Sequence, residues 1–137
     1  MTRKSPYPLL LAALLLLLTA ASCVPPLLKS GGKKADLLPA TVVRINEEYA
    51  NINTDVDLDD LKALGITHGT LFTVSFRDRT LTALLGKGYA DVSRGEWVGL
   101  IEDDGNLQLA ISFGNAATDL GCAVGDTLYI HQPSGPE

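Results

Sequence analysis

Short runs of alternating or β-branched apolar residues recur along the chain after residue 40, separated by polar or glycine-containing stretches. This alternation is typical of half-buried β-strands. It predicts seven strands, over 41–46, 49–53, 71–76, 79–85, 97–101, 107–111 and 127–131. The pair Arg77-Asp78 separates the third and fourth strands, and Asp104-Gly105 lies between the fifth and sixth. Both pairs favour tight turns, so we expect hairpins at these two places.

Two short segments interrupt the strand pattern with the signals of helix ends. The segment DLDDLKAL (57–64) begins with Asp57, a favourable N-cap, and is followed by Gly65. The segment NAATDL (115–120) begins with Asn115, another N-cap residue, and is followed by Gly121. Glycine readily adopts the left-handed conformation that closes a helix. The sequence therefore predicts two helices of one or two turns.

The two predicted helices lead into similar sequences. LGITHGTLFTV (64–74) and LGCAVGDTLYI (120–130) share a leucine-glycine pair, a second glycine four residues later, and then a strand. Many short strands separated by turn signals are typical of a small barrel or sandwich. Because the similarity of these two segments suggests two related halves of one closed sheet, we predict a mostly β fold: a small antiparallel β-barrel with two short helices.

The first residues have the composition of a secretory signal peptide. Arg3 and Lys4 precede a leucine- and alanine-rich run, and Ala20-Ala21-Ser22-Cys23 resembles a bacterial lipobox. We predict a lipoprotein signal peptide (1–22), a lipid-anchored flexible linker (23–39), the barrel domain (40–131) and a disordered tail (132–137). Ordinary cleavage after a small residue and an uncleaved anchor are the alternatives.

The lipobox predicts a location as well. Cys23 would carry palmitate or similar acyl chains, and two or more chains give stable membrane anchoring. The protein would be an extracytoplasmic lipoprotein, facing the periplasm or the cell surface. Cys122 is the other cysteine and is expected to be a small buried apolar residue. A disulfide between these two cysteines is the alternative.

The charge balance excludes one class of partner. After Cys23 the chain holds nine basic and sixteen acidic residues, a net charge of −7. Nucleic-acid affinity depends on neutralising phosphates with lysine and arginine. We therefore expect no nucleic-acid binding.

The sequence shows no catalytic or metal-binding motif. DVDLDD (55–60) lacks the glycine and glutamate positions of a calcium-binding EF-hand loop, and helix capping explains its charges. Glu102-Asp103-Asp104 is read as a solvated turn, with a carboxylate acid/base pair as the alternative. His68 and His131 have no partner at metal-ligand spacing and are expected on the surface. We expect no metal and no cofactor.

Four stretches, in this order, carry a family resemblance: RINEEYANINTD (44–55), LKALGITHGT (61–70), YADVSRGEWVGLI (89–101) and GNLQLAISFGNAATDLGCAVGDTLYI (105–130). Together they resemble the C-terminal domain of the S-adenosyl-L-methionine hydroxide adenosyltransferases, the group that includes the fluorinating and chlorinating enzymes. In that family a separate N-terminal domain supplies the catalytic aspartate. The C-terminal domain borders the adenine at a subunit interface of a trimer. The resemblance implies a half-site without chemistry.

The resemblance also implies which residues contact a ligand. Tyr49 and Asn51 fall on nucleoside contacts of the relatives, and Tyr89 falls near an aromatic residue that packs on the adenine. Asp103 and Asp104 fall on positions that border the base. The segment from Ile111 to Phe113 matches the one whose backbone reads the adenine edge. Two positions depart from the family pattern: Asn46 replaces aspartate, and Ala50 replaces a glycine that would tolerate positive φ.

These observations predict a non-catalytic, lipid-anchored binding or interaction module that takes a nucleoside-like ligand. Its partners would be the membrane and either further copies of itself, as a trimer, or a partner chain. Two alternatives remain. One is a structural or protein-interaction lipoprotein with a degenerate pocket. The other is an enzyme half-site completed by a separate catalytic chain.

Overall fold

The computed structural model describes residues 36–135. The predicted signal peptide, Cys23 and most of the predicted linker lie outside these residues. The described part holds seven strands, two α-helices and a short 3₁₀ helix. The strands are β1 (Leu37–Ile45), β2 (Ile52–Asp57), β3 (Leu71–Phe76), β4 (Arg79–Leu85), β5 (Trp97–Ile101), β6 (Asn106–Ile111) and β7 (Thr127–His131). The helices are α1 (Leu58–Ala63), η2 (Tyr89–Asp91) and α2 (Ala116–Leu120).

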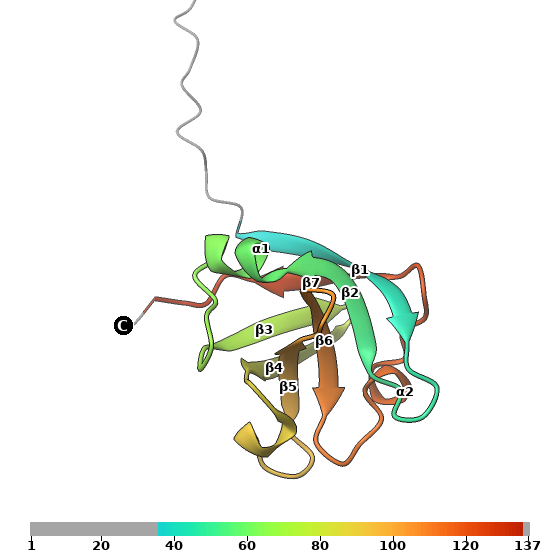
Figure 1. Ribbon diagram of the computed structural model, residues 1–137. Coiled ribbons are helices and arrows are strands. Elements are labelled where there is room, and N and C mark those ends of the chain that lie inside the picture. Colours follow the sequence, from blue (N-terminus) through green and yellow to red (C-terminus); the bar gives the residue numbers. More distant parts are fainter. Residues whose placement is uncertain (1–35, 136–137) are drawn as a thin grey trace, which may run out of the picture. The chain divides into compact units, whose positions relative to one another are not determined.

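The strands close into a barrel in the order β1-β2-β6-β5-β4-β3-β7 (Figure 1). Every neighbouring pair is antiparallel except β4 and β5, which run parallel. The predicted fold class, a small and mostly antiparallel barrel with two short helices, is confirmed. Closure pairs both edges of every strand, and so removes the unpaired sheet edges that promote aggregation.

The predicted spans of β3, β4, β5 and β7 agree with the structure, and β6 begins one residue earlier than predicted. The start of β1 differs. The strand begins at Leu37, inside the predicted linker, because its first residues pair with β7: Leu37 lies opposite His131 and Pro39 opposite Tyr129. The barrel therefore starts three residues before the predicted boundary at Ala40. At the other end, residues 132–135 have no regular secondary structure.

The prediction of a strand over 49–53 is wrong in its bounds, because β2 covers Ile52–Asp57. A turn occupies the residues before it. The Asn46 side chain accepts hydrogen bonds from the backbone N–H groups of Glu48 and Tyr49, each at 2.9 Å. Ala50 then has a φ of 52°, which no strand residue adopts. Local side-chain capping thus delays the strand until Ile52.

Both helices begin and end where the sequence predicts. Asp57 caps α1: its side chain accepts from the N–H of Asp60, while the Asp60 side chain accepts from the N–H of Asp57. This reciprocal capping box gives the acidic stretch a structural role. Asn115 precedes α2, but its side chain forms no capping hydrogen bond. Gly65 and Gly121 follow the helices in the left-handed conformation, with φ of 83° and 77°.

The two helix–turn–strand segments have matching backbone geometry. After α1, the N–H of Ile66 donates to the carbonyl of Leu61, and after α2 the N–H of Cys122 donates to Ala117. A second left-handed glycine, Gly69 or Gly125, then leads into β3 or β7. These two strands are neighbours in the barrel. The similarity between the sequences of these two segments therefore corresponds to a structural repeat.

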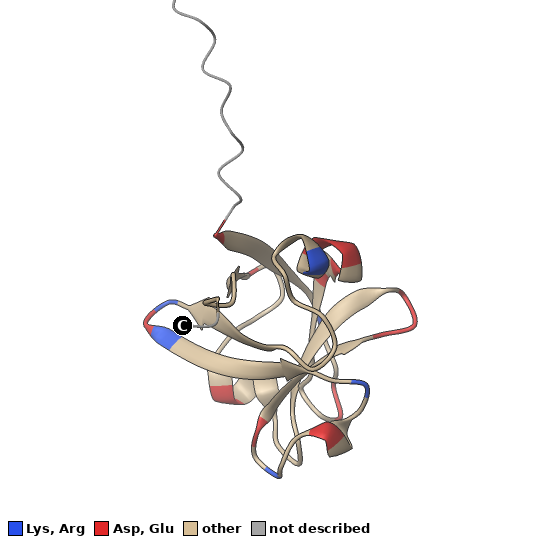
Figure 2. Cartoon of the chain, turned by 90° about the vertical axis from the view of Figure 1, so that its left-hand side faces the viewer, with Lys and Arg blue, Asp and Glu red and all other residues tan. Residues whose placement is uncertain are grey.

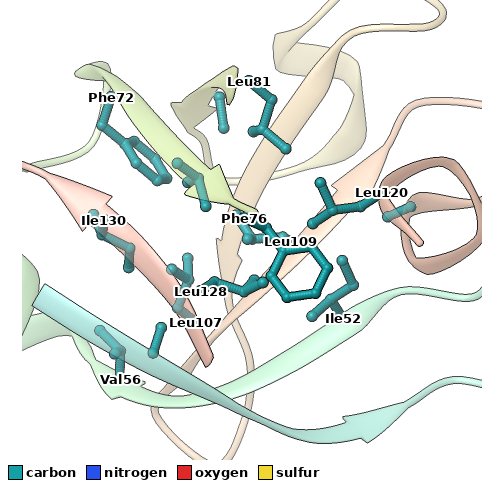
Figure 3. Close-up of a cluster of buried hydrophobic side chains, with 14 of the residues drawn as sticks. Ile52, Val56, Phe72, Phe76, Leu81, Leu107, Leu109, Leu120, Leu128 and Ile130 are labelled. Carbon is teal, nitrogen blue, oxygen red and sulfur yellow. The ribbon is translucent and has the colours of Figure 1, made fainter. Parts of the chain in front are cut away.

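Alternate residues of the strands point into the barrel and form one hydrophobic core. Figure 3 shows ten of these core side chains converging: Ile52, Val56, Phe72, Phe76, Leu81, Leu107, Leu109, Leu120, Leu128 and Ile130. Phe72 is fully buried, and Trp97 packs against the cluster. Cys122 is buried as well. The two helices add Leu61 and Leu120 to the core.

Charged residues lie mainly on turns, loops and α1, as Figure 2 shows. Within residues 36–135, one ion pair crosses between elements: the Arg79 guanidinium contacts the Asp119 carboxylate at 3.1 Å, and so ties the start of β4 to α2. His68 is exposed, whereas His131 is half-buried and its Nε2 lies 2.7 Å from the Ser75 hydroxyl. None of the described helices has the length and apolar character needed to cross a membrane.

Candidate functional site

A pocket of about 580 Å³ opens where β6 ends, between three segments that are distant in the sequence. The turn before β2 forms one wall, the segment from η2 to the start of β5 forms the second, and the turn between β6 and α2 forms the third. The lining residues are Tyr49, Asn51, Tyr89, Arg94, Ile111, Ser112, Phe113, Gly114 and Asn115.

Asn51 and Ser112 are the buried polar residues of the pocket, and Asn51 has the larger hydrogen-bonding capacity. Asn51 is 4% exposed, and its Nδ2 donates to the Tyr89 hydroxyl at 2.9 Å. An asparagine amide has two N–H groups and a carbonyl oxygen. The hydrogen bond to Tyr89 uses one N–H group. The second N–H and the carbonyl together form a donor–acceptor pair that suits the edge of a nucleobase.

The turn that presents Asn51 is anchored on both sides. Asn46 closes it through the two hydrogen bonds described above, and the carbonyl of Ala50 accepts from the N–H of Ala117 at 2.8 Å. The latter bond satisfies one of the unpaired N–H groups at the start of α2. The hydrogen bond from Ala117 requires the Ala50 carbonyl to point towards α2. Ala50 has a positive φ in this conformation. The strain expected for an alanine at this position is therefore present.

The turn after β6 exposes an aromatic side chain. Phe113 is 81% exposed and has a φ of 58°, so a non-glycine residue adopts a strained backbone conformation to present its ring to solvent. The N–H of Gly114 donates to the carbonyl of Ile111 at 3.0 Å, which keeps the turn tight. A Cβ atom on Gly114 would lie 2.6 Å from the Cγ2 atom of Ile111. Glycine is required here by this close approach.

The segment that carries Arg94 is joined to the end of β6 by backbone hydrogen bonds. The N–H of Gly95 donates to the carbonyl of Ser112 at 2.8 Å, and the N–H of Ser112 donates to Glu96 at 3.0 Å. These bonds place Arg94 beside Phe113, and the guanidinium carbon lies 4.8 Å from the centre of the Phe113 ring. This distance is within the range of a cation–π interaction.

The loop that carries Tyr89 is organised by Asp91. The Asp91 carboxylate accepts hydrogen bonds from the N–H groups of Lys87 and Gly88, at 2.7 and 3.2 Å. The neighbouring Gly86 has little free space, because a Cβ atom there would lie 3.0 Å from this carboxylate. The loop is thus held in the conformation that brings the Tyr89 hydroxyl to Asn51.

The electrostatic character of the pocket differs from that of the rest of the domain. Arg94 is the only charged residue among those that line it, and none of them is acidic. Glu48 lies next to the pocket and raises the pKa of the Tyr49 hydroxyl above its usual value, first through a side-chain hydrogen bond and second through its charge. The Tyr49 hydroxyl is therefore neutral at pH 7.

The structure brings together five of the seven residues that sequence reasoning proposed for ligand contact: Tyr49, Asn51, Tyr89, Ile111 and Phe113. Asp103 and Asp104 do not line this pocket. They lie in the β5–β6 turn, where the Asp104 side chain accepts from the N–H of Asn106 at 3.0 Å. The strand β6 separates that turn from the pocket by about 20 Å, the length of a six-residue strand. Both aspartates belong to a hairpin turn, and their proposed contact with a base stays a prediction that this pocket does not include.

Sequence reasoning missed three of the lining residues. Arg94 lies in a quoted motif but received no role, although it is the one basic residue between η2 and β5. Asn115 is predicted only as a helix N-cap, and Gly114 lies in the quoted stretch 105–130 without a predicted role in the site. The combination of Phe113 with a following glycine was the available signal, since a glycine directly after an aromatic residue at a strand end indicates a tight turn.

The fold and the pocket define a small closed β-barrel domain with a pocket, lined in part by aromatic residues, at the end of one strand. A family model described as the SAM hydroxide adenosyltransferase C-terminal domain matches residues 40–129. The chain belongs to this family, which confirms the resemblance inferred from its motifs.

Several solved structures match the chain, and two of them come from Thermotoga maritima and Thermus thermophilus. The crystal structure of an uncharacterized conserved protein from Thermotoga maritima matches with a TM-score of 0.65 and 23% identity, covering 70% of this chain and 36% of that one, and it shares the fold. A conserved hypothetical protein from Thermus thermophilus matches with a TM-score of 0.49 and 20% identity, covering 67% and 34%. This chain thus spans about a third of the length of each. No curated protein matches it.

Proposed function

We propose that this domain is a non-catalytic, lipid-anchored extracytoplasmic module that binds a nucleoside-like ligand in the pocket at the end of β6. The observation that carries the proposal is the meeting of Tyr49, Asn51, Tyr89 and Phe113 around one cavity. The motifs quoted above assigned these four residues to ligand contact, and they come from segments up to 64 residues apart.

The chemistry of the pocket suits a flat aromatic ligand with polar edges. Tyr49, Tyr89 and Phe113 are all largely exposed and offer ring faces for stacking. The Asn51 amide supplies a buried donor–acceptor pair for the edge of the base. Stacking on an aromatic side chain contributes about 1–3 kcal/mol per base, and together with the contacts of Asn51 it would approach the roughly 4 kcal/mol of a millimolar dissociation constant.

A binding role without catalysis is supported by the side chains that line the pocket. General acid–base catalysis commonly uses a histidine, carboxylate, lysine, cysteine or tyrosine positioned near the reacting atoms. Among the nine lining residues, Tyr49 and Tyr89 are of these types, and the Tyr89 hydroxyl accepts a hydrogen bond from Asn51. Catalysis by a histidine, carboxylate, lysine or cysteine at the site would need groups from a second chain or domain.

Calorimetric titration of the full-length chain with adenosine and with S-adenosyl-L-methionine tests the proposal. The proposal expects saturable binding that Asn51→Ala weakens at least about tenfold, the effect of losing one well-made polar contact. Absence of binding at millimolar concentrations of both ligands would reject the nucleoside pocket and leave an interaction role for the barrel.

Asn53→Ala is the matched control. Asn53 has the same side chain, lies two residues further along the same segment and is equally buried at 4% exposure, but it does not line the pocket. Both variants lose a buried amide, and Asn53→Ala should cost no more stability than Asn51→Ala, because the buried Asn53 Nδ2 atom has no hydrogen-bond partner within residues 36–135. If the pocket binds the ligand, only Asn51→Ala weakens binding. Equal losses of affinity in both variants would point to general destabilisation.

The lipid anchor is a separate part of the proposal and rests on the lipobox-like sequence that ends at Cys23. Metabolic labelling with radioactive palmitate should mark the wild-type chain and leave Cys23→Ala unlabelled. Label that persists in the variant would reject Cys23 as the lipidation site. This outcome would not affect the pocket, because Cys23 lies outside the barrel domain.

The proposal also includes assembly into trimers, as the family resemblance implies. The large exposure of the Phe113 ring supports it, because a second subunit that covers the pocket would bury this ring. Light scattering coupled to size-exclusion chromatography should give three times the mass of one chain. Phe113→Ser should lower that mass if the ring lies in the contact.

A further inference from the structure

We propose that Arg94 selects an anionic ligand, so that the pocket takes a nucleotide, an aromatic base joined to a phosphate, in preference to an uncharged nucleoside. This inference rests on the proposed function and names the ligand class of the same pocket. No motif or family assignment described above gives Arg94 a role.

The local charge of the pocket is opposite to that of the domain. Residues 36–135 contain fifteen acidic and six basic side chains, a net charge of −9. The pocket lining nevertheless contains one arginine and no carboxylate. Most of this domain repels a negatively charged ligand. Near Arg94, the positive guanidinium locally offsets the negative charge of the domain.

The hydrogen-bonding capacity of Arg94 is unused within the described part of the chain. Arg79 pairs with the Asp119 carboxylate, and Arg44 donates to the Asn53 side chain. Between residues 36 and 135, no ion pair or hydrogen bond engages the Arg94 guanidinium, which instead lies over the ring of Phe113. A guanidinium offers five N–H donors in a fork that matches phosphate oxygens, and a cation–π contact uses none of them in a hydrogen bond.

Backbone hydrogen bonds place the segment that carries Arg94 beside the end of β6. The N–H of Gly95 donates to the carbonyl of Ser112, and the Arg94 guanidinium lies over the Phe113 ring. The cationic group and the aromatic residues Tyr49, Tyr89 and Phe113 therefore line the same cavity. A ligand that carries both an aromatic base and an anion can contact both kinds of group there.

Calorimetric titration of the full-length chain with adenosine and with adenosine 5′-monophosphate tests the inference. We expect the monophosphate to bind about tenfold more tightly than adenosine, a typical effect of a hydrogen bond to a charged group. Arg94→Gln should remove this preference, so that the variant binds the monophosphate and adenosine with similar affinity. Raising the ionic strength should weaken monophosphate binding alone.

Arg77→Gln is the matched control. Arg77 is also an exposed arginine over a phenylalanine ring, with its guanidinium carbon 4.7 Å from the centre of Phe76, but it does not line the pocket. The substitution makes the same change in net charge and should preserve the preference. Loss of the preference in both variants would show an effect of overall charge and overturn the role of Arg94.

The remaining outcomes separate this inference from the proposed function. Equal affinity for adenosine and its monophosphate, unchanged in Arg94→Gln, would overturn the inference and leave the nucleoside pocket standing. Monophosphate binding that survives Asn51→Ala but not Arg94→Gln would retain the anion site and reject base recognition by Asn51. Failure of both ligands to bind would overturn both proposals.

Discussion

The buried side-chain amide of Asn51 donates a hydrogen bond to the hydroxyl of Tyr89, 38 residues further along the chain, at 2.9 Å. This bond joins the turn before β2 to the η2 loop across the pocket. It brings together two residues that the family resemblance had assigned separately to ligand contact. The bond thus serves the stability of the domain and the shape of its pocket at once.

Tyr89→Phe should destabilise the domain by about 1 kcal/mol, because it leaves the Asn51 donor without its partner while preserving the ring. The free energy of unfolding from urea titration measures the effect. Tyr129→Phe is the control, since Tyr129 has nearly the same exposure, 44% against 45%, and its hydroxyl has no hydrogen-bond partner within residues 36–135. Equal losses in both variants would contradict a structural role for the Asn51–Tyr89 bond.

Ala50→Gly should stabilise the domain by about 0.5 kcal/mol. The left-handed conformation costs an alanine about 1–2 kcal/mol, which exceeds the entropic cost of about 0.5–1 kcal/mol that glycine brings. Thermal unfolding would show a raised midpoint. Ala123→Gly, at an exposed turn alanine without positive φ, should lower it. A lowered midpoint in Ala50→Gly would mean that the turn before β2 is not strained.

Gly114→Ala should destabilise the domain by about 1–3 kcal/mol, the usual effect of forcing an atom into a filled space. The new Cβ would meet the Cγ2 and Cβ atoms of Ile111, which belong to a stiff β-branched side chain and cannot swing away. Gly88→Ala has open space and an extended backbone, so its stability should change by less than about 0.5 kcal/mol. Similar stability of the two variants would disprove the close contact at Gly114.

Cys122 should make stability fall at alkaline pH. Burial and, second, the charge of Asp126 raise the pKa of this thiol above its usual value. The folded state therefore holds the thiol proton more tightly than the unfolded state, whose pKa is about 8.5. The contribution of this thiol to the free energy of unfolding is constant below about pH 8.5. The free energy of unfolding then decreases as pH rises from there towards the raised pKa of the folded state.

Comparison of the wild type with Cys122→Ala isolates this effect. The variant should lose stability at every pH because it leaves a small cavity, but it should lack the additional decrease above about pH 8.5. Any contribution from Cys23 is common to both proteins. Parallel curves of stability against pH would show that the Cys122 thiol titrates alike in both states.

The sequence predicted most of the fold because its signals are local. Four strands agree with their predicted bounds, since each is an apolar run enclosed by turn residues. The caps at Asp57, Gly65 and Gly121 were predicted for the same reason: a cap depends on residues within one turn of it. Where a local signal was ambiguous, the prediction failed. The β-rich stretch after Tyr49 gave no sign that Asn46 would hold it in a turn.

The sequence by itself determined the local elements and, through the order of its motifs, the family. Only the tertiary structure decided which residues share a pocket. Closing the barrel brings the end of β6 beside the turn before β2 and the segment that carries Arg94, and leaves Asp103 at the far end of the same strand. The reason is physical: local signals fix backbone conformation over a few residues, whereas proximity between distant segments depends on strand order and register.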